Sequence, residues 1–406
     1  MVNPPLQAPD LLLVGGRVID PRHGIDTVAD VAILDGRIAQ VGADLPQRGA
    51  REVRDTRGLL VVPGLIDLHT HVYHKATSYG VDPDAVAQRS CVTTMVDAGS
   101  AGAGNFAGLR DFVMAGARTR LLAYLNISFP GIYAFERGVM AGEAADRVLL
   151  SVDHCRDVAR RHLDTIVGIK VRLGEAVSGD VGIEALDRAI QAAMPLGLPV
   201  MTHIGRPRPG YAEILDRLRP GDVLTHCFRP APNAPVDAAG RVLPALRSAR
   251  ARGVLFDIAH GMGAFGFESA QAALGDGFPP DIVSSDVHTL SVNGPAYDLL
   301  HTMSKLLACG VPLTDVIRMA TVGPSHALRR DDLGHLGTGA PADVSLLRMA
   351  EVPLSFVDAI GVRREGVSLL RPAGLVRAGH WHDPAPRPWE ELPPRLAGTY
   401  PQGTNP

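Results

Sequence analysis

Six side chains that can hold a metal ion or take part in catalysis each follow or close a short apolar run. Five are ordinary metal ligands and the sixth is a lone lysine: His69, His71, His203, His226, Asp286 and Lys170. Imidazole and carboxylate are good ligands for zinc and related divalent ions. The set predicts a site for two metal ions with a functional lysine, and such a site supports metal-assisted hydrolysis.

The spacing of the first pair favours ligation. His69 and His71 follow the apolar run 61–68, in which Pro63-Gly64 is expected to turn the chain into a strand. Residues two apart on a strand point to the same side, so both imidazoles can face one site.

For the other four candidates, a functional role must be weighed against a structural one. His203 and His226 taken singly could be buried core histidines, and Asp286 could be a helix N-cap. Their joint occurrence at the ends of apolar runs is better explained by ligation. Lys170 ends the run 165–169. Burying an ammonium is costly and desolvation lowers the pKa of lysine, so this position predicts a functional amine.

The elements that must position these residues alternate between strand-like runs and helical segments, such as 183–194 and 299–308. We count eight apolar runs, at residues 61–68, 93–98, 121–128, 166–172, 198–203, 223–226, 254–258 and 282–285. This pattern predicts an α/β fold with a (β/α)₈ TIM-type barrel, whose active site lies at the C-terminal ends of the strands.

The two ends of the chain are predicted to be β structure. Asp35-Gly36 stands between two apolar runs and is a hairpin signal, and strands are expected again at 342–347 and 374–378. We expect residues 1–60 and 331–382 to form one small β-sandwich, with the barrel at 61–330 inserted between them. Residues 383–406 hold seven prolines and are expected to be an irregular tail, either disordered or laid over the surface.

These motifs as a set resemble the amidohydrolase superfamily, specifically its binuclear branch of dihydroorotase, hydantoinase, D-aminoacylase and related deacetylases. The resemblance runs from about Asp10 to Ala378. It rests on Pro63-Gly-Leu-Ile-Asp-Leu-His-Thr-His71, on the four later candidates and on residues 338–343. Residues 97–100, 170–172 and 297–299 resemble the deacetylase subgroup.

The resemblance implies a role for each candidate. His69, His71 and Asp286 would hold one ion and His203 and His226 the other. Lys170, carboxylated by CO₂ to N6-carboxylysine, would bridge them. Two divalent ions are expected as cofactors, zinc first and manganese as an alternative. Asp286 would also act as general base, so Asp286 and Lys170 are the expected catalytic residues.

Arginines near the strand ends suggest an anionic substrate. Arg172 shares the face of Lys170, and Arg206 and Arg229 follow His203 and His226. Guanidinium matches carboxylate bidentately, although loop arginines can also be ordinary surface residues. The full set of predicted substrate contacts is Arg172, Ser100, His260, Arg206, Arg229 and His288. Phe265 and Phe267 are expected to line an apolar pocket.

Several functions remain open. The leading prediction is removal of an acyl group from a small carboxylate-bearing compound, an N-acyl amino acid or an O-acyl hydroxy acid. Opening of a cyclic amide is the alternative. A deaminase is less favoured, because such enzymes usually have His-x-x-Glu after strand six and Arg229 stands at that glutamate's position. A non-catalytic relative would have lost ligands, and none is missing.

Composition limits the partners. The net charge is -3, the pI is near 6.6 and no basic run occurs, so nucleic acid and anionic membranes are poor partners. No apolar run approaches a transmembrane length, and the four cysteines form no Cys-x-x-Cys pair. We expect a cytoplasmic enzyme acting on a small molecule, and the resemblance suggests a homo-oligomer.

Overall fold

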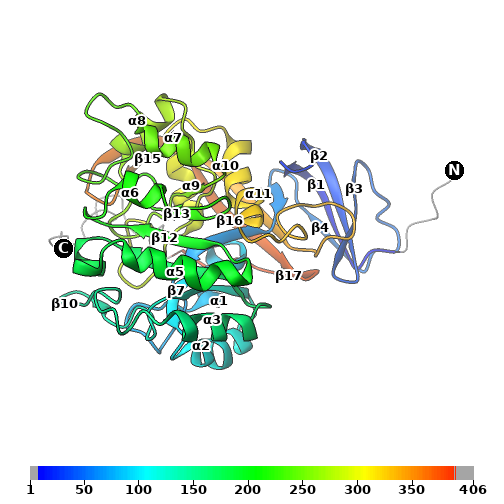
Figure 1. The fold of residues 1–406 in the computed structure, drawn as a ribbon. Helices are drawn as coiled ribbons and strands as arrows, with labels where there is room; N and C mark the ends of the chain where they lie inside the picture. The colour runs from blue at the N-terminus through cyan, green and yellow to red at the C-terminus, as the bar shows by residue number, and fades with distance from the viewer. Residues whose placement is uncertain (1–7, 388, 390–406) are drawn as a thin grey trace.

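A parallel sheet curled into a barrel forms the centre of the molecule (Figure 1). The computed structural model describes residues 8–387 and 389. Seven strands lie in the order of the chain: β6 (Leu65–Thr70), β7 (Val92–Gly102), β8 (Arg120–Asn126), β11 (Ile166–Leu173), β12 (Val200–Ile204), β13 (Val223–Thr225) and β14 (Leu255–Asp257).

The predicted eighth strand, at 282–285, is reduced to two isolated bridges. Ile282 pairs with Asp257 and Val287 pairs with Thr70, both in parallel, which closes the sheet between β14 and β6. The segment between the bridges cannot remain extended because Asp286 adopts a φ of 49°. The barrel is confirmed, and its last position is an irregular segment that carries a site residue.

Most of the helices cover the outside of the barrel and bury their apolar faces against it. The helices are α1 (Pro83–Ser90), α2 (Phe106–Phe112), α3 (Val152–Arg161), α4 (Glu175–Ser178), α5 (Glu184–Ala193), α6 (Tyr211–Leu215), α7 (Pro244–Ala251), α8 (Phe267–Gly275), α9 (Leu299–Ala308), α10 (Leu313–Ala320) and α11 (Val322–Ala327). In α5 the buried Ala185, Leu186, Ala189 and Ala193 recur at three- to four-residue spacing, which is the pattern of a helix with one covered face.

The N- and C-terminal segments join in a second sheet, whose strands β1 to β4 lie at the right of Figure 1. Its order is β17-β16-β15-β5-β1-β2-β3, with β4 paired to β1. The strands are β1 (Leu11–Asp20), β2 (Ile25–Leu34), β3 (Arg37–Gly42), β4 (Glu52–Asp55), β5 (Leu60–Pro63), β15 (Val344–Val357), β16 (Arg363–Arg377) and β17 (His380–His382). The predicted hairpin is confirmed, since Asp35 and Gly36 both have positive φ between β2 and β3.

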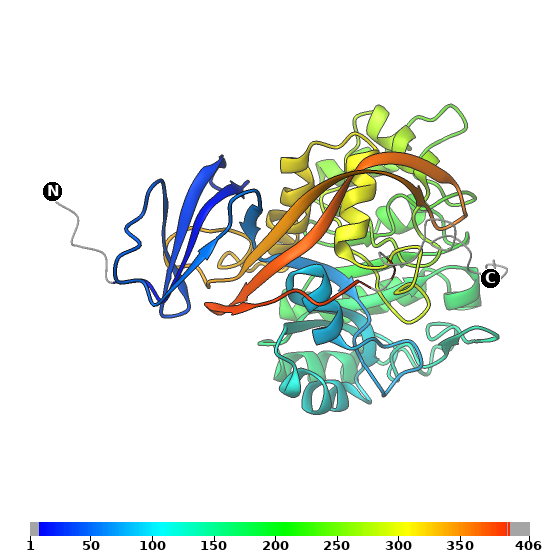
Figure 2. The ribbon, with the colours of Figure 1, turned by 180° about the vertical axis from the view of Figure 1, so that it is seen from behind.

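Two boundaries differ from those expected. The run 61–68 is split at Gly64, so β5 belongs to the second sheet and only β6 to the barrel. A Cβ on Gly64 would lie 2.3 Å from Thr93 Oγ1, which explains why glycine stands at this change of sheet. Strand β15 extends well beyond residue 347, and β16 begins well before residue 374. The hairpin that they form arches over the barrel against α9 (Figure 2). Its outer half alternates between half-buried and exposed residues, so it lacks the continuous apolar run that predicted the inner half.

The described part of the proline-rich tail is laid over the barrel, one of the two alternatives expected. Gln88 Nε2 donates to the Asp383 carbonyl at 2.9 Å, and Arg387 forms a buried ion pair with Asp298, the N-cap of α9, at 2.8 Å. The rest of the tail lies outside the described residues. No helix in the described ranges has the length and hydropathy needed to cross a bilayer.

Candidate active site

The barrel brings all six candidate side chains to one end of its strands. His69 lies on β6 and His71 directly after it, Lys170 on β11 and His203 on β12. His226 follows β13, and Asp286 comes from the irregular eighth segment. All six line one cavity of about 430 Å³.

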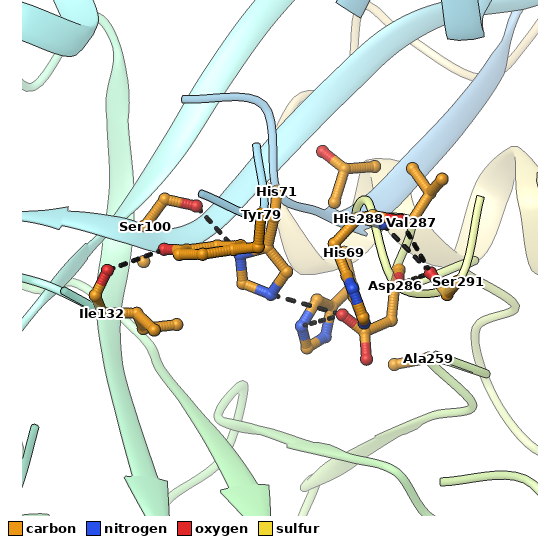
Figure 3. Close-up of polar contacts among 12 residues, drawn as sticks. His69, His71, Tyr79, Ser100, Ile132, Ala259, Asp286, Val287, His288 and Ser291 are labelled. Atoms are coloured by element: carbon orange, nitrogen blue, oxygen red, sulfur yellow. Dashed lines mark hydrogen bonds and ion pairs between the residues drawn. The ribbon is translucent and has the colours of Figure 1, made fainter. Parts of the chain in front are cut away.

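Three of them form a compact cluster with the geometry of a metal site (Figure 3). Ligand atoms of His69, His71 and Asp286 lie within 4.8 Å of one another, and all three residues are buried. Asp286 Oδ1 is 3.4 Å from His69 Nε2 and 3.3 Å from His71 Nε2. Burial raises the pKa of Asp286 to about 6.

The tautomer of His69 follows from its neighbours. The Thr225 hydroxyl donates its one proton to Asp257 Oδ2 at 2.8 Å, so it must accept from His69 Nδ1 at 2.8 Å. The proton of His69 is therefore on Nδ1, and Nε2 presents a lone pair to the cluster. Hydrogen bonds of this kind orient metal-ligating histidines.

His226 is fixed in the same way, and His71 has a similar partner. His226 Nδ1 donates to the Ala259 carbonyl at 2.8 Å, which leaves Nε2 as the free nitrogen. His71 Nδ1 lies 2.9 Å from Ser100 Oγ (Figure 3). The His203 ring lies edge-on to that of His226, with 4.4 Å between ring centres.

Lys170 lies among these histidines. It is fully buried, and its Nζ lies 3.3 Å from His69 Nε2 and 3.3 Å from Met201 Sδ. Within the described ranges it makes no ion pair closer than 4.0 Å. Burial lowers the pKa of Lys170 to about 7, although the charge of Asp286 acts in the opposite direction. A substantial fraction of the amine is therefore neutral at physiological pH.

Two glycines leave room for the side chains of Lys170 and Asp286. A Cβ on Gly99 would lie 2.6 Å from Cβ and Cγ of Lys170, and one on Gly261 would lie 2.2 Å from Asp286 Oδ2. Both glycines also have positive φ, so neither position suits another residue.

Four buried polar residues that support the site were not predicted. Asp67 accepts from the Ser285 hydroxyl at 2.5 Å, and Asp97 accepts from the Ser100 amide at 2.7 Å. Thr225 and Asp257 form the chain to His69 described above. The available signal was the polar residue within each apolar run, since a buried polar group needs a partner.

The predicted substrate contacts divide into two groups. Arg172, Arg206, Arg229 and His288 line the cavity. Ser100 and His260 do not: Ser100 is fully buried behind His71, and His260 Nε2 lies 2.7 Å from Lys305 Nζ.

The apolar wall also differs from the one expected. Phe265 and Phe267 are buried in the core and do not line the cavity. The apolar lining comes instead from Tyr79, Ile132, Phe135, Met140, Val177 and Met262.

The donor set fits divalent metal ions. The His69 lone pair faces the buried carboxylate of Asp286 and the amine of Lys170, and His226 Nε2 carries no proton in the neutral ring. Four imidazoles and one carboxylate are the usual ligands of zinc and of similar ions.

Comparisons with known proteins agree with this geometry. Residues 60–360 match the model of the amidohydrolase family. The chain is 33% identical over 358 residues to a deacetylase of Agrobacterium fabrum, covering 88% of this chain and 87% of that protein. It is 32% identical over 377 residues to a deacetylase of Enterococcus faecalis, covering 92% and 99%.

Solved structures give the same architecture. An adenine deaminase and a dihydroorotase are each 31% identical, with TM-scores of 0.85 and 0.84. The match covers 92% of this chain in both cases, and 100% and 98% of those chains. An N-acyl-D-glutamate deacylase of Bordetella bronchiseptica, with TM-score 0.61 and 18% identity over 94% of this chain and 98% of its own, shows the same fold.

Proposed function

The chain belongs to the amidohydrolase family, and we propose that it removes an acyl group from a small carboxylate-bearing compound with the help of two divalent metal ions. An N-acyl amino acid or an O-acyl hydroxy acid would suit the cavity. The deacetylases that match over most of the chain support acyl removal. The arginines in the lining support an anionic substrate.

One observation carries the proposal: Lys170 is fully buried, forms no ion pair within 4.0 Å among the described residues and touches a histidine whose lone pair faces it. A neutral amine there can attack CO₂, forming an N–C bond and releasing one proton, which leaves a carbamate. That anion would share its oxygens between two cations. His69, His71 and Asp286 would hold one ion, and His203 and His226 the other.

The residues of the chain would then divide the work. Bound divalent ions supply hydroxide at neutral pH and polarise the scissile carbonyl. Asp286, whose carboxylate lies beside His69 and His71 in the cavity, is suited to accept a proton from the attacking water and to return it to the leaving group.

His288 is suited to donate a hydrogen bond to the substrate. The Leu290 amide donates to His288 Nδ1 at 3.2 Å, so in the neutral ring the proton is on Nε2. Burial lowers the pKa of His288 to about 4, which keeps the ring neutral at pH 7.

Cyclic amide opening is the second candidate, supported by dihydroorotases that match the chain locally, such as one from Syntrophotalea carbinolica at 50% identity over 72 residues. Deamination is less favoured because Arg229 lies in the cavity where a deaminase of this family usually has glutamate. We further propose zinc as the metal, the cytoplasm as the location and a homo-oligomeric state. All four cysteines are unpaired, which fits a reducing compartment.

A substrate panel tests the proposal. The metal-loaded enzyme should hydrolyse N-acetyl amino acids or O-acetyl hydroxy acids faster than hydantoins, dihydroorotate or adenine, and chelation should abolish turnover that zinc or manganese restores. Preferred turnover of a cyclic amide or of adenine would overturn it.

A further inference from the structure

The three arginines that line the cavity differ in how their charge is balanced. Arg172 Nη1 lies 3.4 Å from Oε2 of Glu143, an acidic residue that is only 1% exposed. The guanidinium of Arg172 also lies over the Phe135 ring, 5.2 Å from its centre. Arg172 is thus held from two sides by groups of the protein itself.

Glu143 is fixed by the backbone around it. Ser128 Oγ donates to the Glu143 carbonyl at 2.7 Å, and the Ala144 amide donates to the Val177 carbonyl at 3.2 Å. Glu143 Oε1 makes no hydrogen bond to any residue that the structure describes. A buried carboxylate without its cation is costly, so Glu143 requires Arg172 and the pair adds no net charge to the cavity.

The positive charge of Arg229 is not balanced by a comparable ion pair among the described residues. It is half-buried, and within the described ranges its guanidinium makes no ion pair. Burial is the main factor that lowers the pKa of Arg229, and repulsion from Arg206 and Arg172 adds to it. Arg206 is exposed and likewise makes no ion pair in the part of the chain described.

The acidic groups that line the cavity do not neutralise the positive charges of Arg229 and Arg206. Asp286 Oδ1 lies 3.4 Å from His69 Nε2 and 3.3 Å from His71 Nε2, and Glu175 is an exposed residue of the rim that makes no ion pair within the described ranges. The lining therefore has two guanidinium groups over strands β12 and β13 that an anion from outside could satisfy.

We propose that Arg229, assisted by Arg206, forms the subsite that binds the substrate carboxylate, while the Arg172–Glu143 pair is a neutral wall. This rests on the proposed function, which supplies a carboxylate-bearing substrate. A planar guanidinium can bind both carboxylate oxygens through parallel N–H···O bonds, and its partial burial strengthens the contact. Arg229 follows His226 by three residues, so the carboxylate would be bound on the β13 side of the site and the acyl group would lie over the metal cluster.

The test compares substrates that differ only in charge. The metal-loaded enzyme is assayed with an N-acetyl amino acid and with the neutral carboxamide of that amino acid. It is likewise assayed with an O-acetyl hydroxy acid and its carboxamide, and the rate of hydrolysis is measured for each. Wild type should prefer the acids, and Arg229→Gln should reduce that preference roughly 10- to 100-fold, mainly through KM. Arg229→Lys should restore part of it.

The matched control is the double variant Glu143→Gln/Arg172→Gln, which removes both charges together. Its preference for acid over amide should persist, whatever its rate. Metal content and thermal unfolding of every variant establish that it folds. A preference lost in the control and kept in Arg229→Gln would overturn the assignment.

A binding measurement separates this inference from the proposed function. Calorimetry with the deacylated acid and with its amide reports the subsite even if no acyl compound is turned over. Tighter binding of the acid that Arg229→Gln abolishes would sustain the subsite although acyl hydrolysis had failed. Equal binding of acid and amide by wild type would refute the subsite.

Discussion

Single hydrogen bonds decide which nitrogen of each histidine faces the candidate site. The chain from Asp257 through Thr225 to His69 assigns the proton to Nδ1, and the Ala259 carbonyl does the same for His226. Asp257 is itself buried, which raises its pKa to about 6, so it remains largely a carboxylate at neutral pH. The affinity of the site for metal should therefore depend on residues that cannot reach the metal.

Replacing Thr225 by valine removes the acceptor of His69 Nδ1 while keeping the shape of the side chain. We expect metal affinity to fall by about 10- to 100-fold, as is usual when such an outer hydrogen bond is lost. Competition with a fluorescent chelator measures this. The control is Thr202→Val, because the buried Thr202 hydroxyl makes no hydrogen bond. An equal loss in both variants would contradict the tautomer argument.

The reactivity of Lys170 should depend on pH in a way that an exposed lysine does not show. Its lowered pKa of about 7 means that the free amine, the form that attacks CO₂, is already the main species just above pH 7. Carbamate formation in metal-free protein should rise from pH 6 to about pH 7.5 and then level off, as read by ¹³C NMR with labelled bicarbonate. A rise that continues to pH 10 would contradict the cited shift.

At the scale of elements, the regular barrel could be predicted and the irregular parts could not. The strands before Lys170 and His203 are apolar runs of ordinary length, and their ends were placed within a few residues. The eighth segment was expected to be a strand, yet the positive φ of Asp286 and its bonds to neighbouring backbone are tertiary features. The long hairpin of β15 and β16 was underestimated because its outer half packs against α9, a contact that the local sequence does not show.

The residues of the candidate site likewise divide into those that could be predicted from the sequence and those that could not. The grouping of the candidate metal ligands at one end of the barrel could be predicted because residue type and strand position agree, whereas the supporting residues and the neutral Arg172–Glu143 pair depend on contacts across the fold. His260 is the clearest case. In sequence it follows a strand-like run, but in the structure it pairs with a buried lysine of α9.

Lys305 joins α9 to three other segments of the fold. Its Nζ lies 2.7 Å from His260 Nε2, 2.8 Å from the Pro295 carbonyl and 2.7 Å from the Val357 carbonyl. Lys305→Met leaves these acceptors unpaired in the interior, and we expect a loss of about 2–4 kcal/mol in the free energy of unfolding. Urea denaturation measures it. Since His260 precedes Gly261, which contacts Asp286, kcat should fall as well; an unchanged unfolding midpoint would contradict the role.

At the scale of the whole molecule, the described part of the proline-rich tail, here called the C-terminal arm, packs on the outside of the barrel and stabilises it. Arg387 and Asp298 are 1% and 0% exposed, and Asp298 also caps α9 by accepting from the His301 amide. The arm thus stabilises the helix that carries Lys305, although it lies outside the family match at 60–360.

Arg387→Met breaks this pair and leaves a buried carboxylate unpaired. We expect a loss of about 3–5 kcal/mol in the free energy of unfolding, as for other broken buried pairs. Arg330→Met is the control, because Arg330 and Asp332 form a surface pair with 34% and 46% side-chain exposure and should contribute at most about 1 kcal/mol. Equal losses in the two variants, measured by denaturant unfolding, would show that the arm does not fasten α9.

The proposed mechanism requires that Lys170 becomes an anionic bridge between two cations. A crystal of the zinc-loaded protein, grown with bicarbonate and measured at the zinc absorption edge, would reveal this bridge. We expect two anomalous peaks, one beside His69, His71 and Asp286 and one beside His203 and His226, with carbamate density on Lys170 between them. A single peak with a bare Lys170 amine would contradict it.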